Sequence, residues 1–288
     1  MKSIGLIVNP QKEETLRLAA DIASWLAARN IRSLVEEQVA RLINRSDLAA
    51  STEAVTDAEI VVVLGGDGTI LRAARAASPR GTPILGVHLG QYGFITEIHP
   101  PDVMPALERV IGGDYQISER MMLQASLIRD GKTIESTVAL NDAVVSKGPL
   151  ARMLSLRTMV DERLITTYAA DGIIVSSPTG STAYSLSAGG PVVHPDVRVM
   201  IITPICPHTL NARSLVIPDF ESVQIVGECE IEDEMMLTVD GQIGVQLKCG
   251  DKVDVRRAEF PARIIYWDRM SFYDKLQSRL KWGERFST

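Results

Sequence analysis

Residues 60–64, Ile-Val-Val-Val-Leu, form an unbroken apolar run that leads directly into Gly65-Gly66-Asp67-Gly68. An unbroken run predicts a strand that is buried on both faces, as strands are in parallel sheets covered by helices. Shorter apolar runs occur at 4–8 and 84–87, and residues 13–28 carry apolar residues at helical spacing. The first part of the chain is therefore predicted to fold as an open, doubly wound α/β domain.

The pattern changes near residue 119 to short apolar runs separated by turn dipeptides such as Asp130-Gly131 and Asp240-Gly241. This pattern predicts a β-rich, sandwich-like domain over 119–267. Residues 270–281 regain helical spacing, so we expect the C-terminal segment 268–288 to return as a helix to the first domain, 1–118. The length of 288 residues is consistent with two domains.

Composition excludes several classes of protein. The formal charge of −6 argues against a broad nucleic-acid surface, and the short apolar run at the N-terminus predicts neither a signal peptide nor a membrane span. The three cysteines have no CxxC spacing and are interpreted as buried, reduced thiols, which favours a cytoplasmic protein. The four histidines show no metal-ligand spacing, so no protein-bound metal is expected.

The glycine turn after residue 64 is the first candidate for chemistry. Glycines expose main-chain N–H groups that phosphate oxygens can approach, and the start of the following helix favours an anion. Asp67 within that turn is then either a general base, with magnesium neutralising the phosphates, or a turn aspartate that bonds its own backbone. The segment matches neither the GxGxxG fingerprint nor the P-loop.

Two later segments are open to both functional and structural interpretations. Residues 171–191 run from a strand into a short helix at about 181–188 that is rich in small hydroxyl side chains, which either line a slot for a heterocycle and ribose or cap the helix around a core Tyr184. Asn141-Asp142 is either a pair that holds two ribose hydroxyls or an ordinary turn dipeptide. Lys147 is interpreted as a solvated lysine rather than a phosphate contact.

Six segments together resemble the NAD kinase family, in the order in which that family carries them. They are GGDGT at 65–69, GQYGFITE at 90–97, LNDAVVSKG at 140–148, the block at 171–195, TPICPHTLNARSLVIP at 203–218 and DGQ at 240–242. The long block at 171–195 is highly specific. GGDGT is not, because lipid kinases and phosphofructokinases carry close versions of it.

The resemblance implies a fold, an activity and a set of site residues. It implies an α/β domain followed by a β-rich domain with the active site between them, and transfer of the γ-phosphoryl group of ATP to the 2′-hydroxyl of the adenosine ribose of NAD. Mg²⁺ is expected to arrive with ATP, and the chain is expected to form a homodimer or homotetramer. The implied residues are Asp67 as the catalytic carboxylate; Gly66, Gly68 and Thr69 at the phosphates; Asn141 and Asp142 at the ribose; and Phe94, Asp171, Thr179, Thr182, Ala183, Tyr184, Ser187 and Gln242 around the dinucleotide.

One departure from the family pattern concerns the ribose pair. Many members have Asn-Glu where this chain has Asn141-Asp142, so the carboxylate here is one methylene shorter. Two rival functions share part of the pattern: a lipid or sugar kinase with the same glycine loop, and a non-catalytic sensor that binds NAD(P).

Overall fold

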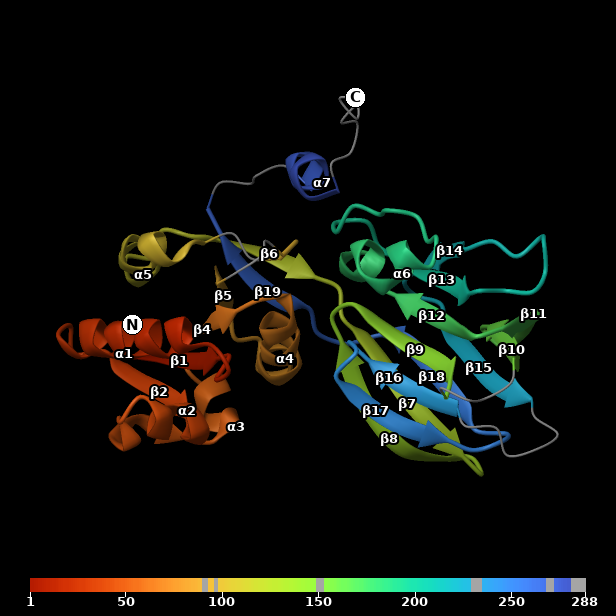
Figure 1. Ribbon diagram of the computed structural model, residues 1–288, viewed down its shortest axis with the longest axis horizontal. Coiled ribbons are helices and arrows are strands. Elements are labelled where there is room, and N and C mark those ends of the chain that lie inside the picture. The colour runs from red at the N-terminus through yellow and green to blue at the C-terminus, as the bar shows by residue number, and fades with distance from the viewer. Residues whose placement is uncertain (90–92, 96–97, 149–152, 229–234, 268–271, 281–288) are drawn as a thin grey trace. The chain divides into compact units, whose positions relative to one another are not determined.

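The computed structural model describes residues 1–89, 93–95, 98–148, 153–228, 235–267 and 272–280 (Figure 1). The chain divides into two compact units, the first formed by Met1–Glu119 with Ala262–Thr288 and the second by Arg120–Pro261. Each unit has its own buried apolar cluster.

The first unit is an α/β fold around one sheet. Its strands are β1 (Ser3–Val8), β2 (Arg32–Glu36), β3 (Ala49–Ala50), β4 (Ile60–Gly65), β5 (Ile84–His88), β6 (Gln116–Arg120) and β19 (Ala262–Tyr266). Its helices are α1 (Glu13–Ala27), α2 (Glu37–Leu42), α3 (Thr52–Thr56), α4 (Asp67–Ala77), α5 (Val103–Ile111) and α7 (Phe272–Leu280), with short 3₁₀ turns η1 (Ser46–Leu48), η2 (Ser78–Arg80) and η3 (Pro100–Asp102).

The sheet of the first unit is covered on both faces, as the unbroken apolar runs predict. Among the described residues its strand order is β3-β2-β1-β4-β5-β19-β6, and β1 to β5 pair in parallel where they are neighbours. Alternate β4 residues, including Ile60 and Leu64, join an apolar cluster with α1 and α5. On β1, a side chain at Gly5 would collide with the carbonyl oxygen of Val55, so α3 lies tightly against the sheet. The doubly wound prediction is confirmed.

Strand β19 belongs to a different unit from the one that the sequence predicted. Residues 262–267 were assigned to the β-rich domain, but β19 pairs in parallel with β5 through Ile264 and Ile84 and belongs to the first unit. The pairing joins residues 180 positions apart in the chain, which a local apolar pattern does not reveal. The C-terminal helix also returns to this unit, because the Arg279 guanidinium carbon of α7 lies 5.8 Å from the centre of the Phe94 ring. Residues 270, 271 and 281 of the expected helix lie outside the described residues.

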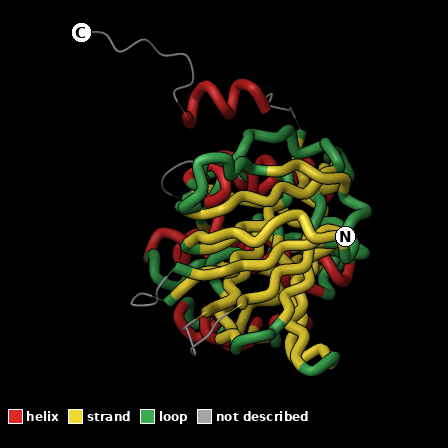
Figure 2. The backbone as a smooth tube through the Cα atoms, turned by 90° about the vertical axis from the view of Figure 1, so that its right-hand side faces the viewer, coloured by secondary structure: helices red, strands yellow, loops and turns green. Residues whose placement is uncertain are grey.

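The second unit is a sandwich of two antiparallel sheets, each with six strands in the part of the chain that is described. One sheet has the order β11-β10-β15-β18-β7-β8 and the other the order β14-β13-β12-β9-β16-β17. In Figure 2, strands are the yellow stretches of tube, and neighbouring strands lie side by side. The strands are β7 (Leu123–Arg129), β8 (Lys132–Ala139), β9 (Asp142–Lys147), β10 (Leu154–Val160), β11 (Arg163–Ala170), β12 (Gly172–Ser176), β13 (Val199–Ile205), β14 (Leu215–Pro218), β15 (Val223–Glu228), β16 (Met235–Val239), β17 (Ile243–Leu247) and β18 (Lys252–Arg257).

Apolar residues from both sheets form one core in the second unit. Leu127 of β7 and Ile225 of β15 share a cluster with Val145 of β9 and Leu237 of β16. The core shared by the two sheets confirms the predicted sandwich-like domain.

The expected helix at 181–188 is split into the 3₁₀ turn η4 (Thr179–Thr182) and the single-turn helix α6 (Tyr184–Ser187).

The cysteine interpretation was wrong. Cys206 is free but exposed, and Cys249 is exposed and disulfide-bonded, while Cys229 lies outside the described residues. Cys206 follows the end of β13, and Cys249 sits in the turn between β17 and β18, where side chains face solvent. Thiols in turns have no core to enter, so composition alone misplaced them.

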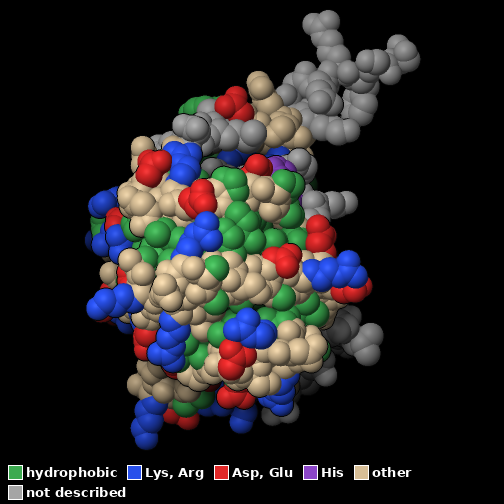
Figure 3. All heavy atoms as spheres, turned by 90° about the vertical axis from the view of Figure 1, so that its left-hand side faces the viewer, with side chains coloured by type: hydrophobic (Ala, Val, Ile, Leu, Met, Phe, Trp, Pro, Cys, Tyr) green, Lys and Arg blue, Asp and Glu red, His purple; other side chains and the backbone are tan. Residues whose placement is uncertain are grey.

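The described surface and helices add two observations. On the face in Figure 3, Lys and Arg side chains are interspersed with Asp and Glu, and no broad basic patch is visible there. Among the described helices, none combines the length and the apolar character needed to cross a membrane.

Candidate active site

Asp67 occupies the first turn of α4, directly after the glycine turn that ends β4. Helix α4 begins at Asp67, with Gly66 as its N-cap. The N–H groups of Thr69 and Ile70 already bond the carbonyl oxygen of Gly66. A side chain at Gly66 would meet no atom of the described residues within 4 Å, so these residues leave the outer side of the turn open. The turn therefore leaves room for a ligand beside a carboxylate at a helix start.

The segment 93–95 holds one oxygen of the Asp67 carboxylate. The backbone N–H of Phe94 donates to Asp67 Oδ2 at 2.9 Å. A Cβ atom at Gly93 would lie 1.8 Å from Asp67 Oδ1, so only glycine allows this close approach. The resemblance places Phe94 beside the dinucleotide; the structure brings its backbone to Asp67. Gly93 was not among the expected site residues, although it lies in the GQYGF segment.

The other carboxylate oxygen of Asp67 lacks a partner. Oδ1 is buried, and no hydrogen-bond donor reaches it among the described residues. A buried acceptor without a partner costs about 1–3 kcal/mol, which a substrate hydroxyl or a divalent cation would offset. The residues thus fit a magnesium ion brought by a nucleotide. Within the described part of the chain, no group of three or more His, Cys, Asp or Glu side chains could hold a metal by itself.

Asn141 and Asp142 lie at the start of β9, in the second unit, and the Asp240 carboxylate organises their backbone. Asp240 Oδ1 accepts from the N–H of Asn141 at 2.8 Å and of Asp142 at 3.3 Å, and Oδ2 accepts from the N–H of Leu140 at 3.1 Å. The N–H of Asp240 in turn donates to the carbonyl oxygen of Asp142 at 2.9 Å. The pair is therefore held in one conformation by a residue about 100 positions away.

Asp142 and Asp240 form a buried pair of like charges. Their exposed fractions are 5% and 7%. Burial, and secondly the charge of Asp240, raise the pKa of Asp142 from 3.8 to about 7. The loss of solvation at Asp142 favours its protonated form. A carboxyl group that titrates near neutral pH is typical of a functional site.

The segment after β12 packs directly against Asn141. The N–H of Ser177 donates to the carbonyl oxygen of Asn141 at 2.8 Å, and Ser177 Oγ donates to that of Leu140 at 2.5 Å. A side chain at Gly180 would lie 2.1 Å from the carbonyl oxygen of Asn141. The sequence segments around Asn141, Gly180 and Asp240 therefore meet in one place, although neither Gly180 nor Ser177 was expected there.

The small polar residues of 179–187 divide into two sets. Ser181 and Ser185 are buried and serve the fold, since Ser181 Oγ bonds the backbone of Pro178 and Val193 and Ser185 Oγ lies 2.9 Å from Thr203 Oγ1. Tyr184 is 47% exposed, so it is not a core residue. The residues that the resemblance placed along the dinucleotide are all at least partly exposed: Thr179, Thr182, Ala183, Tyr184 and Ser187. The core interpretation of Tyr184 was therefore wrong, and the exposed side chains are accessible to a ligand, so their contact with a dinucleotide stays a prediction.

Within the second unit, Asp171 does not lie near Asn141 and Asp142. The register of β9 and β12 pairs Ser176 with Asp142 and Gly172 with Ser146, so Asp171 lies at the other end of the strand pair, about 16 Å away at 3.3 Å per residue. There it forms an ion pair with Lys147, whose Nζ lies 2.8 Å from Asp171 Oδ1. Lys147 is therefore a paired lysine rather than a solvated one.

Gln242 and Asp240 share the turn between β16 and β17. The N–H of Gln242 donates to the carbonyl oxygen of Val239 at 3.0 Å, and the residue is exposed. Asp240 and Gly241 have positive φ angles of 51° and 63°, which suits an Asp-Gly hairpin turn. The sequence indicated the turn, but it did not indicate the hydrogen bonds that the Asp240 side chain accepts from distant backbone N–H groups.

Comparison with known proteins covers both units. Residues 4–115 match the ATP-NAD kinase N-terminal domain and residues 140–267 match the ATP-NAD kinase C-terminal domain. The chain is 47% identical over 283 residues to the NAD kinase of Moorella thermoacetica, covering 98% of this chain and 90% of that protein. It is 44% identical over 285 residues to the NAD kinase of Geotalea daltonii, covering 99% and 100% respectively.

Two solved structures have the same fold. The yeast NADH kinase complexed with NADH superposes with a TM-score of 0.91 at 25% identity, covering 100% of this chain and 89% of that one. An NAD kinase from Archaeoglobus fulgidus in complex with ATP gives a TM-score of 0.77 at 23% identity, covering 98% and 99%.

The matches across both units define the chain as a kinase, an enzyme that transfers a phosphoryl group. Because the matches extend across 140–267, the likeness goes well beyond the glycine loop that lipid and sugar kinases share. The chain belongs to the NAD kinase family, and its activity is that of an NAD kinase.

Proposed function

We propose that Asp67 is the general base that takes the proton from the 2′-hydroxyl of the adenosine ribose of NAD. The ribose oxygen then attacks the γ-phosphorus of ATP, the bond to the β-phosphate oxygen breaks, and NADP and ADP leave. The observation that supports this role is the hydrogen bonding of the Asp67 carboxylate. Oδ2 accepts from the Phe94 N–H, and Oδ1 is buried with no hydrogen-bond partner among the described residues. A fixed carboxylate with one free acceptor oxygen can receive a hydroxyl proton.

The glycine turn around Asp67 is proposed to receive phosphate groups. Gly66, Gly68 and Thr69 supply a helix start with little side-chain bulk, which favours the approach of an anion. When bound with ATP, Mg²⁺ would neutralise phosphate charge beside the glycine turn, while Asp67 Oδ1 stays available to the ribose hydroxyl.

The second unit is proposed to hold the dinucleotide. Asn141 offers an amide and Asp142 a carboxylate, on a backbone that Asp240 fixes, and together they can bind two ribose hydroxyls. The exposed residues of η4 and α6, among them Tyr184 and Ser187, would contact the adenine and its ribose. Roles for Phe94, Asp171 and Gln242 in binding are proposed on the resemblance.

We also propose that the enzyme assembles as a homodimer or homotetramer. Membership of a family whose members oligomerise supports the assembly, and light scattering on the purified protein measures it directly. An absence of any species larger than a monomer would contradict it.

The test of the function is an assay of purified protein in which donor and acceptor are varied separately. ATP or polyphosphate is offered as donor, and NAD, NADH, diacylglycerol or a sugar phosphate as acceptor, with Mg²⁺ present throughout. The proposal predicts NADP from ATP and NAD and no phosphorylation of the lipid or the sugar phosphate. Phosphorylation of either of those acceptors without NADP formation would refute it.

A further inference from the structure

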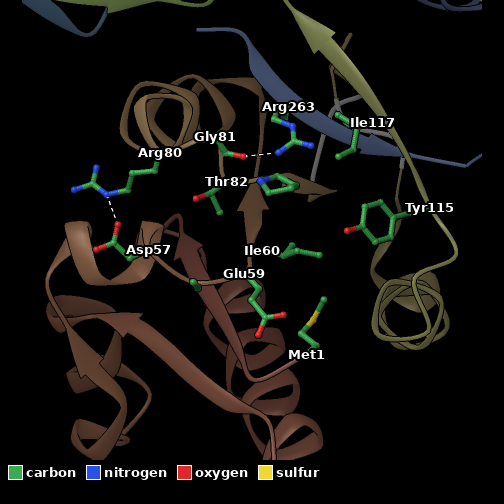
Figure 4. Close-up of a pocket in the computed structure, with 12 residues that line it drawn as sticks. Met1, Asp57, Glu59, Ile60, Arg80, Gly81, Thr82, Tyr115, Ile117 and Arg263 are labelled. Atoms are coloured by element: carbon green, nitrogen blue, oxygen red, sulfur yellow. Dashed lines mark hydrogen bonds and ion pairs between the residues drawn. The ribbon is translucent and has the colours of Figure 1, made fainter.

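A cavity of about 490 Å³ lies in the first unit, at the amino-terminal end of its parallel strands (Figure 4). Ile60, the first residue of β4, and Pro83, just before β5, line it, together with Arg263 on β19. Asp67 follows the opposite end of β4, about 20 Å away at 3.3 Å per residue. The cavity is therefore separate from the glycine turn.

Arg263 is the unusual group in this cavity. Its guanidinium Nη1 donates to the carbonyl oxygen of Gly81 at 2.9 Å, while its Nε is buried and has no hydrogen-bond partner in the described part of the chain. The side chain is half-buried, and no acidic side chain within the described residues forms an ion pair with it. A partly buried cation without a counter-charge is unfavourable, so an anion placed beside it would be stabilised.

The acidic groups of the cavity are already engaged. Asp57 forms an ion pair with Arg80, whose Nε lies 2.5 Å from Asp57 Oδ1. Glu59 accepts a hydrogen bond from the backbone N–H of Lys2 at 2.5 Å. Neither carboxylate forms an ion pair with Arg263, so its guanidinium group remains available to an anion.

The remaining lining offers one further polar contact and an apolar surface. The hydroxyl of Tyr115 points toward the interior of the cavity in Figure 4, and it has no hydrogen-bond partner among the described residues. Ile60, Pro83 and Ile117 supply apolar walls. The volume lies in the range of about 300–1,000 Å³ that is typical of small-molecule sites.

We propose that this cavity binds a small organic anion, a carboxylate or a phosphate monoester that carries an apolar or aromatic body. Arg263 takes the anionic group through the N–H groups that Gly81 does not use, and planar guanidinium groups bind either kind of anion with two parallel hydrogen bonds. Tyr115 donates to the same group, and the isoleucine and proline side chains cover the body.

The test uses phenyl phosphate and benzoate as probes, titrated calorimetrically into the full-length protein with ATP present so that the phosphate turn is occupied. Both probes carry the same aromatic body, so their relative affinity identifies the preferred anionic group. Phenol, which lacks the charge, is expected to bind at least about tenfold more weakly.

Variants assign the binding to the cavity. Arg263→Gln is expected to weaken the preferred probe about tenfold to a hundredfold, Arg263→Lys less, and Tyr115→Phe a few-fold. The matched control is Arg32→Gln, which removes an exposed arginine from β2 of the same sheet and should leave the affinity unchanged. Saturable binding that survives in both Arg263→Gln and Tyr115→Phe would overturn the proposal, as would the absence of saturable binding of either probe to the parent protein.

Discussion

Replacing Asp142 with Asn is predicted to stabilise the enzyme while impairing it. Asp142 is 5% exposed, and burial, followed by the charge of Asp240, raises its pKa to about 7. Above that pH the folded protein holds a buried carboxylate next to a second one. Asn has a similar shape without the charge, so the variant escapes this penalty.

The magnitude follows from proton linkage. A pKa that is 3.8 in the unfolded chain and about 7 in the folded protein means that the folded state keeps its proton longer. The stabilising contribution is complete below the unfolded pKa and is lost as pH rises through the folded pKa, at about 1.36 kcal/mol per pH unit. The gain in the free energy of unfolding for Asp142→Asn should therefore grow from about 2 kcal/mol at pH 5 to about 4 kcal/mol at pH 8.

The assay is urea unfolding followed by far-ultraviolet circular dichroism at both pH values. Asp130→Asn is the matched control, because Asp130 is exposed in the β7–β8 turn and its φ of 49° suits Asn. The control should change the free energy of unfolding by the same small amount at both pH values. Since Asp142 is proposed to hold the ribose, its variant should also raise the KM for NAD. A gain that does not depend on pH, or a loss of stability at pH 8, would refute the reasoning.

Three further predictions concern other contacts. Gly93→Ala should lower kcat by displacing the Asp67 carboxylate, since the added Cβ would lie 1.8 Å from Asp67 Oδ1; an unchanged kcat would show that the carboxylate needs no such placement. Tyr184→Ala should raise the KM for NAD but alter the free energy of unfolding by only about 0.5 kcal/mol, because about half of the Tyr184 side chain is exposed; a stability loss with an unaltered KM would reverse the assignment. Arg129→Met should lower the free energy of unfolding at pH 7 by about 3 kcal/mol, because it leaves the buried Asp251 carboxylate without its two bonds from Arg129. Burial raises the pKa of Asp251, but the hydrogen bonds from Arg129 and from the Lys248 backbone N–H hold it below 3.8, so the loss should shrink as pH falls below about 4. Equal losses at pH 3 and pH 7 would contradict this.

Local patterns predicted the elements and the glycine turn well. The run at 60–64 indicated a doubly covered strand, and β4 is buried along its whole length. The glycines after it indicated a turn before a helix, and Asp67 begins α4. These features depend on neighbours in the chain, so the sequence contains the information directly.

Features set by distant contacts were missed. The carboxylate of Asp240 bonds the backbone at Leu140, Asn141 and Asp142, but an Asp-Gly dipeptide by itself indicates only a turn. Which hydroxyl side chains of 179–187 are buried depends on contacts with distant parts of the chain. Ser181 bonds the backbone of Val193, and Ser185 contacts Thr203 on β13. Such pairings depend on the packed fold and not on the local residue types.

Single-turnover formation of NADP by Asp67→Asn, with saturating ATP, NAD and Mg²⁺, tests the role of the carboxylate most directly. The matched control is Asp21→Asn, an exposed aspartate on α1. We expect the Asp67 variant to lose about 10²- to 10⁴-fold in rate while the control keeps the parental rate. A rate for Asp67→Asn equal to that of the parent would contradict the proposed role of Asp67 as the base.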